Sequence, residues 1–380
     1  MALNSRITQS PVILLLGAGA SVPLGKPVME QFVRGLVEQI EYIENPALLL
    51  SLVSARGYDL EKIMEDLETF LALDYISSFA FHGEPTYEAS RSDAENLRSY
   101  IRHSIIREYR NIDANKAINV YQPLLDEIFL HLDSANHCLP IFTTNYDLAI
   151  ESFCELKYSQ YVLVDGMQEN GREVQWNRQE FDMFRMDHPA TNSPESQRIF
   201  TLFDPTYGEL DLGSQLPKRS IVLFKLHGSV NWMRMVPGGG IVQSLPMYDL
   251  IDSDRFQNAI IYPAGNKVAT SEPYLTAYHY FSRCCENAKI VVAIGYSFRD
   301  YDVLISLLKA RQVNEKLQLL LLSPNAYNIL RTIPDEDNIL WITALHGSFG
   351  DNASSTKYLT EIGKRIAGNL EDGSPRSDPS

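Results

Sequence analysis

The chain has 380 residues, of which 45% are hydrophobic, and its formal net charge is −15. This length suits one large domain with insertions, and the hydrophobic fraction is sufficient for a folded core, which excludes global disorder. The acidic balance argues against direct nucleic-acid binding, because nucleic-acid phosphates repel an acidic surface. The N-terminal residues show no signal pattern, and no apolar run is long enough to span a membrane, so we expect a cytoplasmic protein with no membrane partner.

The first predicted strand is Val12–Leu16, where five apolar residues follow one another without alternation. Such a run is typical of a central parallel strand with helices on both faces. Gly17 and Gly19 then allow positive φ angles and close approach of a phosphate or a second backbone. Ser21 can cap a following helix, whose free N–H groups would face an anion. This pattern fits either a dinucleotide site or a tight turn in an α/β core that binds no phosphate.

Residues 28–136 are predicted to form a helical insertion. From Leu60 to Leu71 apolar residues recur at steps of three and four, as in an amphipathic helix. Residues 90–110 and 114–132 predict further helices, with Pro123 restricting the first turns of the second. The acidic side chains between the apolar positions of the first helix are expected to face solvent. They are Glu61, Glu65, Asp66 and Glu68.

Residues 1–27 and 137–367 are assigned to one α/β domain, a Rossmann-like doubly wound parallel sheet. Apolar runs predict its further strands, and amphipathic stretches predict its helices. The strands are expected at 138–144, 221–226, 259–262, 289–294, 317–322 and 339–343, and the helices near Asp147 and at 273–287, 302–312 and 358–366.

Three other segments differ from this pattern. Residues 155–220 are polar and interrupted by Pro and Gly, which predicts a smaller irregular β-rich insertion within the α/β domain. Residues 231–243 predict a hairpin with a glycine turn. Residues 368–380 are almost free of apolar side chains and predict a disordered tail.

The four cysteines give no metal or disulfide pattern. Cys138, Cys154, Cys284 and Cys285 include no C-x-x-C pair. Their spacing fits neither a disulfide framework nor a zinc ribbon, so we expect reduced, buried thiols.

Five predicted strands end at polar or glycine-rich clusters. In a parallel sheet these ends lie along one edge, where doubly wound folds bind ligands. Several coincident clusters are more informative than one glycine turn. The clusters are Gly17-Ala18-Gly19, Thr143-Thr144-Asn145, His227-Gly228-Ser229, Gly295-Tyr296-Ser297 and Ser323-Pro324-Asn325.

In the order GAGAS, TTNYD, KLHGS, GYS and SPN, these motifs resemble the sirtuin-like NAD-binding fold, and specifically the bacterial sirtuin-like NAD-cleaving effectors of anti-phage defence. The resemblance covers residues 17–325 and implies NAD as the substrate. Because stand-alone sirtuin-like subunits are known to act with a HerA-type ring ATPase, it also implies such an ATPase, or another trigger protein, as a candidate partner. A homo-oligomer is expected as well.

The resemblance also implies roles for individual residues. Asn145 would order a water or the ribose hydroxyls near the nicotinamide, and His227 would act as the base on a ribose hydroxyl or on the attacking water. Four residues would hold the pyrophosphate: Gly17, Ala18, Gly19 and Ser21. Asp147 would lie at the nicotinamide and its ribose, and Gly295 and Ser297 would contact phosphate and ribose. Ser323 and Asn325 would lie beside the adenosine ribose, and Thr144 is assigned to NAD without a finer role.

These residue types suit cleavage of the nicotinamide–ribose bond, which leaves an oxocarbenium-like sugar. The departing nicotinamide is neutral and needs no strong acid, and an imidazole with a pKa of about 6.5 can remove a proton at neutral pH. An amide supplies a donor and an acceptor without adding charge. From the residues alone, however, His227 fits a structural histidine equally well, and Asn145 fits a helix cap.

Two other groups keep more than one interpretation. Arg299, Asp300 and Asp302 fit either the mouth of a pocket or helix capping and surface pairing. A second His-Gly-Ser, His346 to Ser348, follows GYS rather than preceding it, so we interpret it as structural.

Two departures from deacylating sirtuins favour water as the acceptor. No cysteine pairs follow His227, so we expect no structural zinc. The glycine turn continues as VPLGKPV, without the Pro-Asp-Phe-Arg of deacylating sirtuins. We therefore predict an NAD glycohydrolase that releases nicotinamide and ADP-ribose as a triggered effector of anti-phage defence. The alternatives are an NAD-dependent deacylase or ADP-ribosyltransferase, and a non-catalytic module that binds NAD or ADP-ribose.

Overall fold

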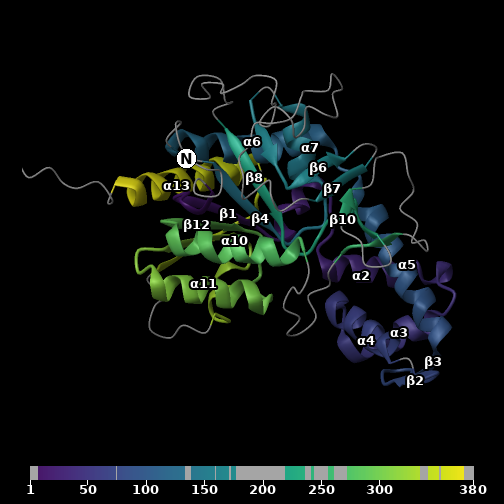
Figure 1. Ribbon diagram of the computed structural model, residues 1–380. Coiled ribbons are helices and arrows are strands. Elements are labelled where there is room, and N and C mark those ends of the chain that lie inside the picture. The colour runs from purple at the N-terminus through teal and green to yellow at the C-terminus, as the bar shows by residue number, and fades with distance from the viewer. Residues whose placement is uncertain are drawn as a thin grey trace, which may run out of the picture.

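The centre of the protein is a seven-stranded parallel sheet with the order β14-β13-β12-β1-β4-β8-β5 (Figure 1). The computed structural model describes residues 7–73, 75–132, 138–158, 160–170, 173–176, 219–235, 241–243, 256–260, 272–333, 341–350 and 352–371. The strands of this sheet are β1 (Val12–Leu16), β4 (Leu139–Thr143), β5 (Val162–Val164), β8 (Ser220–Lys225), β12 (Ile290–Ile294), β13 (Gln318–Ser323) and β14 (Ile342–His346). The predicted doubly wound α/β sheet is confirmed.

The order of the strands reverses at β1. From β1 the chain continues to β4 on one side, and it later returns to β12 on the other side. Leu16 aligns with Ile294 of β12 and with Thr143 of β4. The loops that follow these three strands therefore leave the sheet side by side, at the position where doubly wound folds bind ligands.

Helices cover both faces of the sheet, which explains why β1 is apolar at every position. Ile13 and Leu15 belong to the core under α10 (Tyr274–Asn287) and α11 (Tyr301–Val313). The other face packs against α6 (Ala114–His131), α7 (Ala149–Leu156) and α13 (Asn352–Glu371). Figure 1 shows α6 and α13 above the sheet and α10 and α11 below it.

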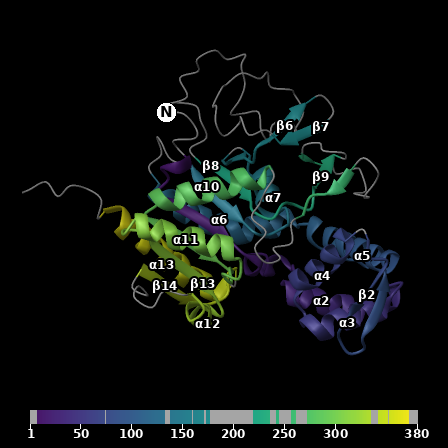
Figure 2. The ribbon, with the colours of Figure 1, turned by 60° about the horizontal axis from the view of Figure 1, so that its bottom comes forward.

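The residues between β1 and α6 form a unit beside the sheet, which we call the helical block (residues 29–110; Figure 2). It has its own hydrophobic core, which Tyr146 and Val230 of the α/β part join. Its elements are α2 (Met29–Glu38), the short 3-10 helix η3 (Ile40–Tyr42), α3 (Pro46–Arg56), α4 (Leu60–Ala72), the antiparallel strands β2 (Ser78–Phe81) and β3 (Tyr87–Ser90), and α5 (Arg91–Arg110).

The last helix of the predicted insertion belongs to another layer. Although α6 lies within 28–136, it packs on the main sheet. Pro123 lies inside α6, which continues through it, so the predicted restriction of the first turns is wrong.

Side-chain caps fix where several helices begin. Asp59 accepts a hydrogen bond from the backbone of α4, Ser90 from that of α5, Asp113 from that of α6 and Asp300 from that of α11. Each cap satisfies N–H groups that have no partner inside the helix.

A second, antiparallel sheet has the strand order β11-β9-β10-β7-β6. Its strands are β6 (Met167–Asn170), β7 (Glu173–Trp176), β9 (Trp232–Met235), β10 (Ile241–Gln243) and β11 (Phe256–Asn258). The hairpin β9–β10 is as predicted, whereas the glycines of its turn lie outside the described residues. The strand predicted at 259–262 is instead β11, and residues 261–262 lie outside the described part.

The predictions for residues 155–220 and for the tail at 368–380 are both partly wrong. Residues 155–220 include β5, which pairs with β8 in the main sheet, so this stretch is not wholly an excursion from it; residues 177–218 lie outside the described part. The helix α13 continues to Glu371, so disorder from residue 368 onward is wrong for 368–371, and residues 372–380 lie outside the described part.

The burial of the cysteines and the hydropathy of the helices complete the description of the fold. All four cysteines are free and buried, and burial raises the pKa of the Cys284 and Cys285 thiols. Among the described residues, no helix combines the length and the hydropathy that a membrane crossing requires.

Candidate functional site

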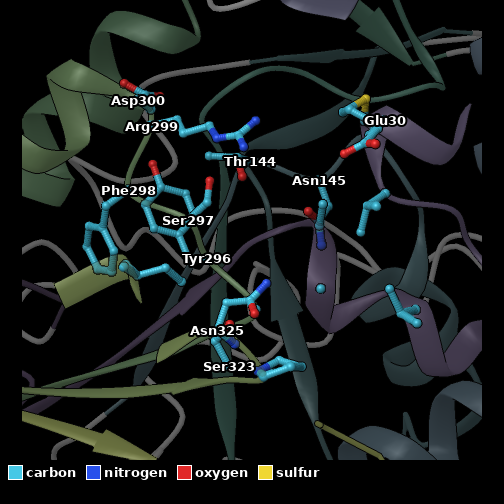
Figure 3. Close-up of a pocket in the computed structure, with 18 of the residues that line it drawn as sticks. Glu30, Thr144, Asn145, Tyr296, Ser297, Phe298, Arg299, Asp300, Ser323 and Asn325 are labelled. Carbon is cyan, nitrogen blue, oxygen red and sulfur yellow. Dashed lines mark hydrogen bonds between the residues drawn. The ribbon is translucent and has the colours of Figure 1, made fainter. Parts of the chain in front are cut away.

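A cavity of about 970 Å³ lies at the edge of the main sheet where the strands end. This volume falls within the usual range for small-molecule sites, roughly 300–1,000 Å³. Residues from the α/β part and from the helical block line it, and Figure 3 shows members of both groups. Nine of the predicted site residues are among them: Ala18, Gly19, Thr144, Asn145, His227, Gly295, Ser297, Ser323 and Asn325.

The glycine turn has a different geometry from the predicted one. The φ angle of Gly17 is −110°, and two three-residue 3-10 helices follow, η1 (Ala18–Ala20) and η2 (Val22–Leu24). Ser21 makes no side-chain cap. The N–H groups of Gly17 and Gly19 donate to Ile294 O and Gly295 O, both at 3.0 Å. The prediction that Ser21 caps the following helix is therefore wrong.

Close backbone approach explains the glycines instead. A Cβ on Gly17 would lie 2.6 Å from Gly295 O, and one on Gly19 would lie 2.7 Å from Gly295 Cα. Gly295 itself has a φ of +60°, a conformation that favours glycine. These three glycines let the loops after β1 and β12 pack against each other at the strand-order reversal.

A buried hydrogen-bond network fixes Asn145. Its Nδ2 donates to Gly17 O and to Ser21 Oγ, both at 2.9 Å. Ser21 Oγ in turn donates to Asp147 Oδ2 at 2.5 Å. Since both amide hydrogens are engaged, Oδ1 is the atom that Asn145 can offer as an acceptor to a molecule in the cavity.

This network also separates supporting residues from lining residues. Gly17, Ser21 and Asp147 do not line the cavity but lie behind it. Asp147 Oδ1 accepts from the backbone N of Ala149 at 3.0 Å, at the start of α7. Asp147, rather than Asn145, therefore supplies the side-chain hydrogen bond to the first residue of α7.

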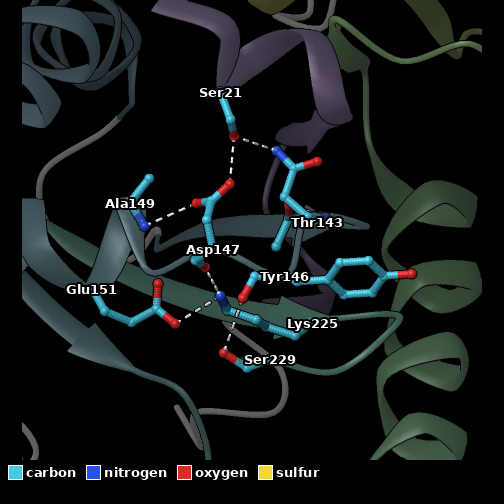
Figure 4. Close-up of polar contacts among 9 residues, drawn as sticks. Ser21, Thr143, Tyr146, Asp147, Ala149, Glu151, Lys225 and Ser229 are labelled. Atoms are coloured by element: carbon cyan, nitrogen blue, oxygen red, sulfur yellow. Dashed lines mark hydrogen bonds and ion pairs between the residues drawn. The ribbon is translucent and has the colours of Figure 1, made fainter. Parts of the chain in front are cut away.

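A buried ion pair, Lys225–Glu151, lies next to the loop after β4. Lys225 Nζ is 2.8 Å from Glu151 Oε1, and the side chains are 3% and 9% exposed. Lys225 Nζ also donates to the backbone oxygen of Asp147 (Figure 4). The pair joins β8, α7 and the loop after β4, and it leaves no net charge in the core.

His227 follows β8 and lines the cavity beside Asn145. The next residue, Gly228, has a φ of +85°, and a Cβ there would lie 2.5 Å from Ala259 O. His227 Nε2 is 2.7 Å from Asp300 Oδ2, and the two side chains are 6% and 9% exposed. The sequence analysis did not identify this pairing.

Asp300 combines the two roles that the sequence left open. Its Oδ1 accepts from the backbone N of Asp302 at 2.9 Å and so caps α11, while its Oδ2 contacts His227 and accepts from Tyr278 OH at 3.0 Å. Burial raises the pKa of Asp300, but the hydrogen bond and charge of His227, together with the Val303 N–H and Tyr278, outweigh burial and lower it. An ionised Asp300 places a proton on His227 Nε2 and leaves Nδ1 as the basic atom.

The loops after β12, β13 and β14 supply further residues that line the cavity. Ser297 and Asn325 are exposed, and the hydroxyl of Ser323 accepts from the backbone N of Asn325 at 3.2 Å. The second His-Gly-Ser follows β14: the ring of His346 stacks on Tyr327, whereas Ser348 lines the cavity. The stacking agrees with a structural role for His346.

The helical block contributes residues that the sequence analysis did not assign to the site. Glu30, Tyr58, Leu60 and Glu61 line the cavity. Glu61 was expected to face solvent, and this expectation is wrong. The apolar spacing of α4 identified which residues point into the helical block, but it carried no information on what covers the polar side of α4.

The charge environment of Glu61 is unusual for a carboxyl group. Burial raises its pKa to about 7, against the attraction of His227, which lowers it. Asp59 and Asp300 raise it further, and Arg299 lowers it. Glu61 therefore changes charge near neutral pH.

No metal site is found in the described residues: they contain no group of three or more His, Cys, Asp or Glu side chains placed to hold an ion. The polar atoms that face the cavity are amide, hydroxyl, imidazole, guanidinium and carboxyl groups, which suit an organic ligand with hydroxyl and phosphate groups.

Comparison with known proteins shows which family the chain matches. The SIR2-like domain family matches residues 140–332, just over half of the chain. Among curated proteins none matches the sequence. Similar solved structures include a Sir2 homologue in complex with NAD (14% identity, 97% of this chain and 94% of the other covered, TM-score 0.39). Another is a mutant Sir2 homologue in complex with ADP-ribose (13% identity, 98% of each chain covered, TM-score 0.38). On the strength of the family match, the chain belongs to the SIR2-like domain family.

Proposed function

We propose that this protein binds NAD in the cavity and hydrolyses it to nicotinamide and ADP-ribose. Membership of the SIR2-like family implies an NAD-binding and NAD-using protein. The observation that carries the finer proposal is that two fixed polar groups line the same cavity: the His227–Asp300 pair, at 2.7 Å, and Asn145, whose amide is held by two hydrogen bonds.

Each of these groups has a task in the reaction. His227 Nδ1, with Nε2 held by Asp300, is the base that acts on a ribose hydroxyl or on the attacking water. Asn145 Oδ1 accepts a hydrogen bond from a ribose hydroxyl or from that water. Because nicotinamide leaves as a neutral molecule, the site needs no strong acid beside it.

The other lining residues are proposed to hold the remainder of NAD. Ala18 and Gly19 would contact the pyrophosphate, with Gly295 and Ser297 beside it, and Thr144 would lie near the nicotinamide ribose. Ser323 and Asn325 would flank the adenosine ribose. Gly17, Ser21 and Asp147 are proposed to support these contacts from behind rather than to touch NAD.

We further propose that the protein is a triggered effector of anti-phage defence. The support is the motif resemblance to NAD-cleaving defence effectors and the chemistry itself, since unregulated NAD cleavage would harm the host cell. A HerA-type ring ATPase, or another trigger protein, is the proposed partner of a homo-oligomer of this chain. The helical block, which lines the cavity, is the proposed route by which a partner controls access.

The test is to incubate the full chain with NAD and to separate the products by chromatography. Parallel samples contain an acylated peptide, or the HerA-type ATPase together with ATP. Equimolar nicotinamide and ADP-ribose without an added acceptor support hydrolysis. Nicotinamide that appears only with the peptide would indicate a deacylase or ADP-ribosyltransferase instead, and NAD binding without turnover in every sample would indicate a binding module.

A further inference from the structure

Glu61 is a carboxyl group in the cavity to which the proposed mechanism gives no task. It is the second residue of α4, and it reaches the cavity from the helical block, whereas Asn145 and His227 reach it from the α/β part. The helical block and the α/β part thus each bring a basic group to the same cavity, Glu61 and His227.

The charged and titratable groups that face Glu61 come from several elements. On its own helix the cap Asp59 is a near neighbour. From the α/β part it interacts with His227 after β8 and with Arg299 and Asp300 before α11. The hydroxyls of Tyr278 and Tyr296 also lie within its electrostatic reach.

Two other charged side chains of the cavity wall are engaged elsewhere. Arg56 is 2.7 Å from Asp66, and Glu30 is 2.8 Å from Arg34. No hydrogen bond or ion pair of the Glu61 carboxyl is found within the described part of the chain. Glu61 is therefore the helical-block carboxylate best placed to act on a bound molecule.

Hydrolysis requires a group that takes a proton from water, and a second proton acceptor is useful for the ribose hydroxyl. His227 has one nitrogen on Asp300 and therefore one basic atom, Nδ1. One nitrogen atom cannot take a proton from the water and from the ribose hydroxyl at the same time, so a second base in the same cavity is needed for one of them.

We propose that Glu61 is a catalytic residue whose carboxylate accepts the proton of the water that attacks the ribose. This inference rests on the proposed function and deepens it. His227 Nδ1 then accepts the hydrogen bond of the ribose hydroxyl, takes its proton as positive charge develops on the sugar and returns it when ADP-ribose forms, and Asn145 orders the ribose.

The step balances without a further reactant. The bond between C1′ of the ribose and the nicotinamide nitrogen breaks, and its electron pair neutralises the positive charge of the ring. The water oxygen forms the new bond to C1′, and Glu61 takes one proton from it and releases that proton to solvent. NAD and water thus give nicotinamide, ADP-ribose and one proton.

The test compares Glu61→Gln with Glu65→Gln, a matched change one turn further along α4 and outside the cavity wall. Glu61→Gln is expected to slow hydrolysis roughly 10²–10⁴-fold, the usual effect of losing a positioned base, whereas Glu65→Gln stays within about twofold of wild type. Calorimetric titration with ADP-ribose should give affinities for both variants within about threefold of wild type.

A structural role for Glu61 is separated from a chemical one by azide, a nucleophile that needs no base. Azide is expected to restore nicotinamide release by Glu61→Gln and to give ADP-ribosyl azide as the product. Hydrolysis within twofold of wild type, or a slow variant that azide does not accelerate, would overturn the assignment of Glu61 alone. A wild-type protein that never cleaves NAD would instead overturn the proposed function, together with this inference.

Discussion

Replacing Glu61 with Gln is expected to stabilise the folded protein at pH 8 far more than at pH 5. Burial raises the pKa of Glu61 from 4.5 to about 7, and Asp59 and Asp300 add to the shift. Between these two values the unfolded chain has released the proton while the folded protein keeps it, so the free energy of unfolding falls as the pH rises. One pKa unit corresponds to about 1.4 kcal/mol, so the loss reaches about 3 kcal/mol above pH 7.

Glutamine removes this loss because it cannot ionise. Urea unfolding of wild type and variant, followed by circular dichroism, measures the difference at each pH. The stability advantage of the variant should grow by about 2 kcal/mol between pH 5 and pH 8. Glu65→Gln, on the same helix but outside the cavity wall, is the matched control for removing a carboxyl group from α4. An advantage of Glu61→Gln that does not change with pH would refute the partly buried environment that disfavours the charged form of this side chain.

Three further changes test other parts of the site. Asp300→Asn should lower kcat for NAD cleavage by roughly 10²–10⁴-fold with little change in ADP-ribose affinity, because the amide no longer holds a proton on His227 Nε2; an unchanged kcat would remove Asp300 from the mechanism. Gly17→Ala should lower the melting temperature, since its Cβ would lie 2.6 Å from a backbone oxygen, whereas Gly35→Ala, in a helix with nothing within 4 Å, should raise it slightly. Lys225→Met leaves its carboxylate partner buried and unpaired and should cost about 3–5 kcal/mol in unfolding experiments; a cost below 1 kcal/mol would contradict the burial of that pair.

The sheet could be predicted from the sequence because its strands are covered on both faces. The residues Val12–Leu16 are at most 1% exposed, and such a strand is apolar at every position. Polar clusters follow the ends of these runs, so Asn145 and His227, which line the cavity, could be chosen as candidates from their position after a strand. Parallel topology then brings strand ends together without any long-range information.

The missed features depend on contacts between distant segments. Ser21 precedes a short helix and has the residue type of a cap, but its hydroxyl bonds Asp147, which is 126 positions away in the sequence. Helical periodicity in α4 separates one face from the other, but it does not reveal that the first turn of α4 lies at the cavity. For this reason Glu61 was assigned to solvent and the partner of His227 was not identified.

The glycine turn illustrates the same limit. The glycines at positions 17 and 19 correctly predicted that another group approaches the backbone closely. In the structure the backbone of Gly295 is that group. A glycine reports that space is tight, and it does not report what fills that space.

The most direct test of the central claim is nicotinamide release from NAD by wild type, Asn145→Ala and His227→Ala, assayed side by side after circular dichroism has shown that all three are folded. We predict that wild type yields equimolar nicotinamide and ADP-ribose with no acceptor other than water. Each variant should be slower by roughly 10²-fold or more, because a positioned base or its ordered partner is lost. Cleavage by either variant at half the wild-type rate or faster would contradict the role of that residue. Intact NAD in all samples, with and without the proposed partner, would contradict the account as a whole.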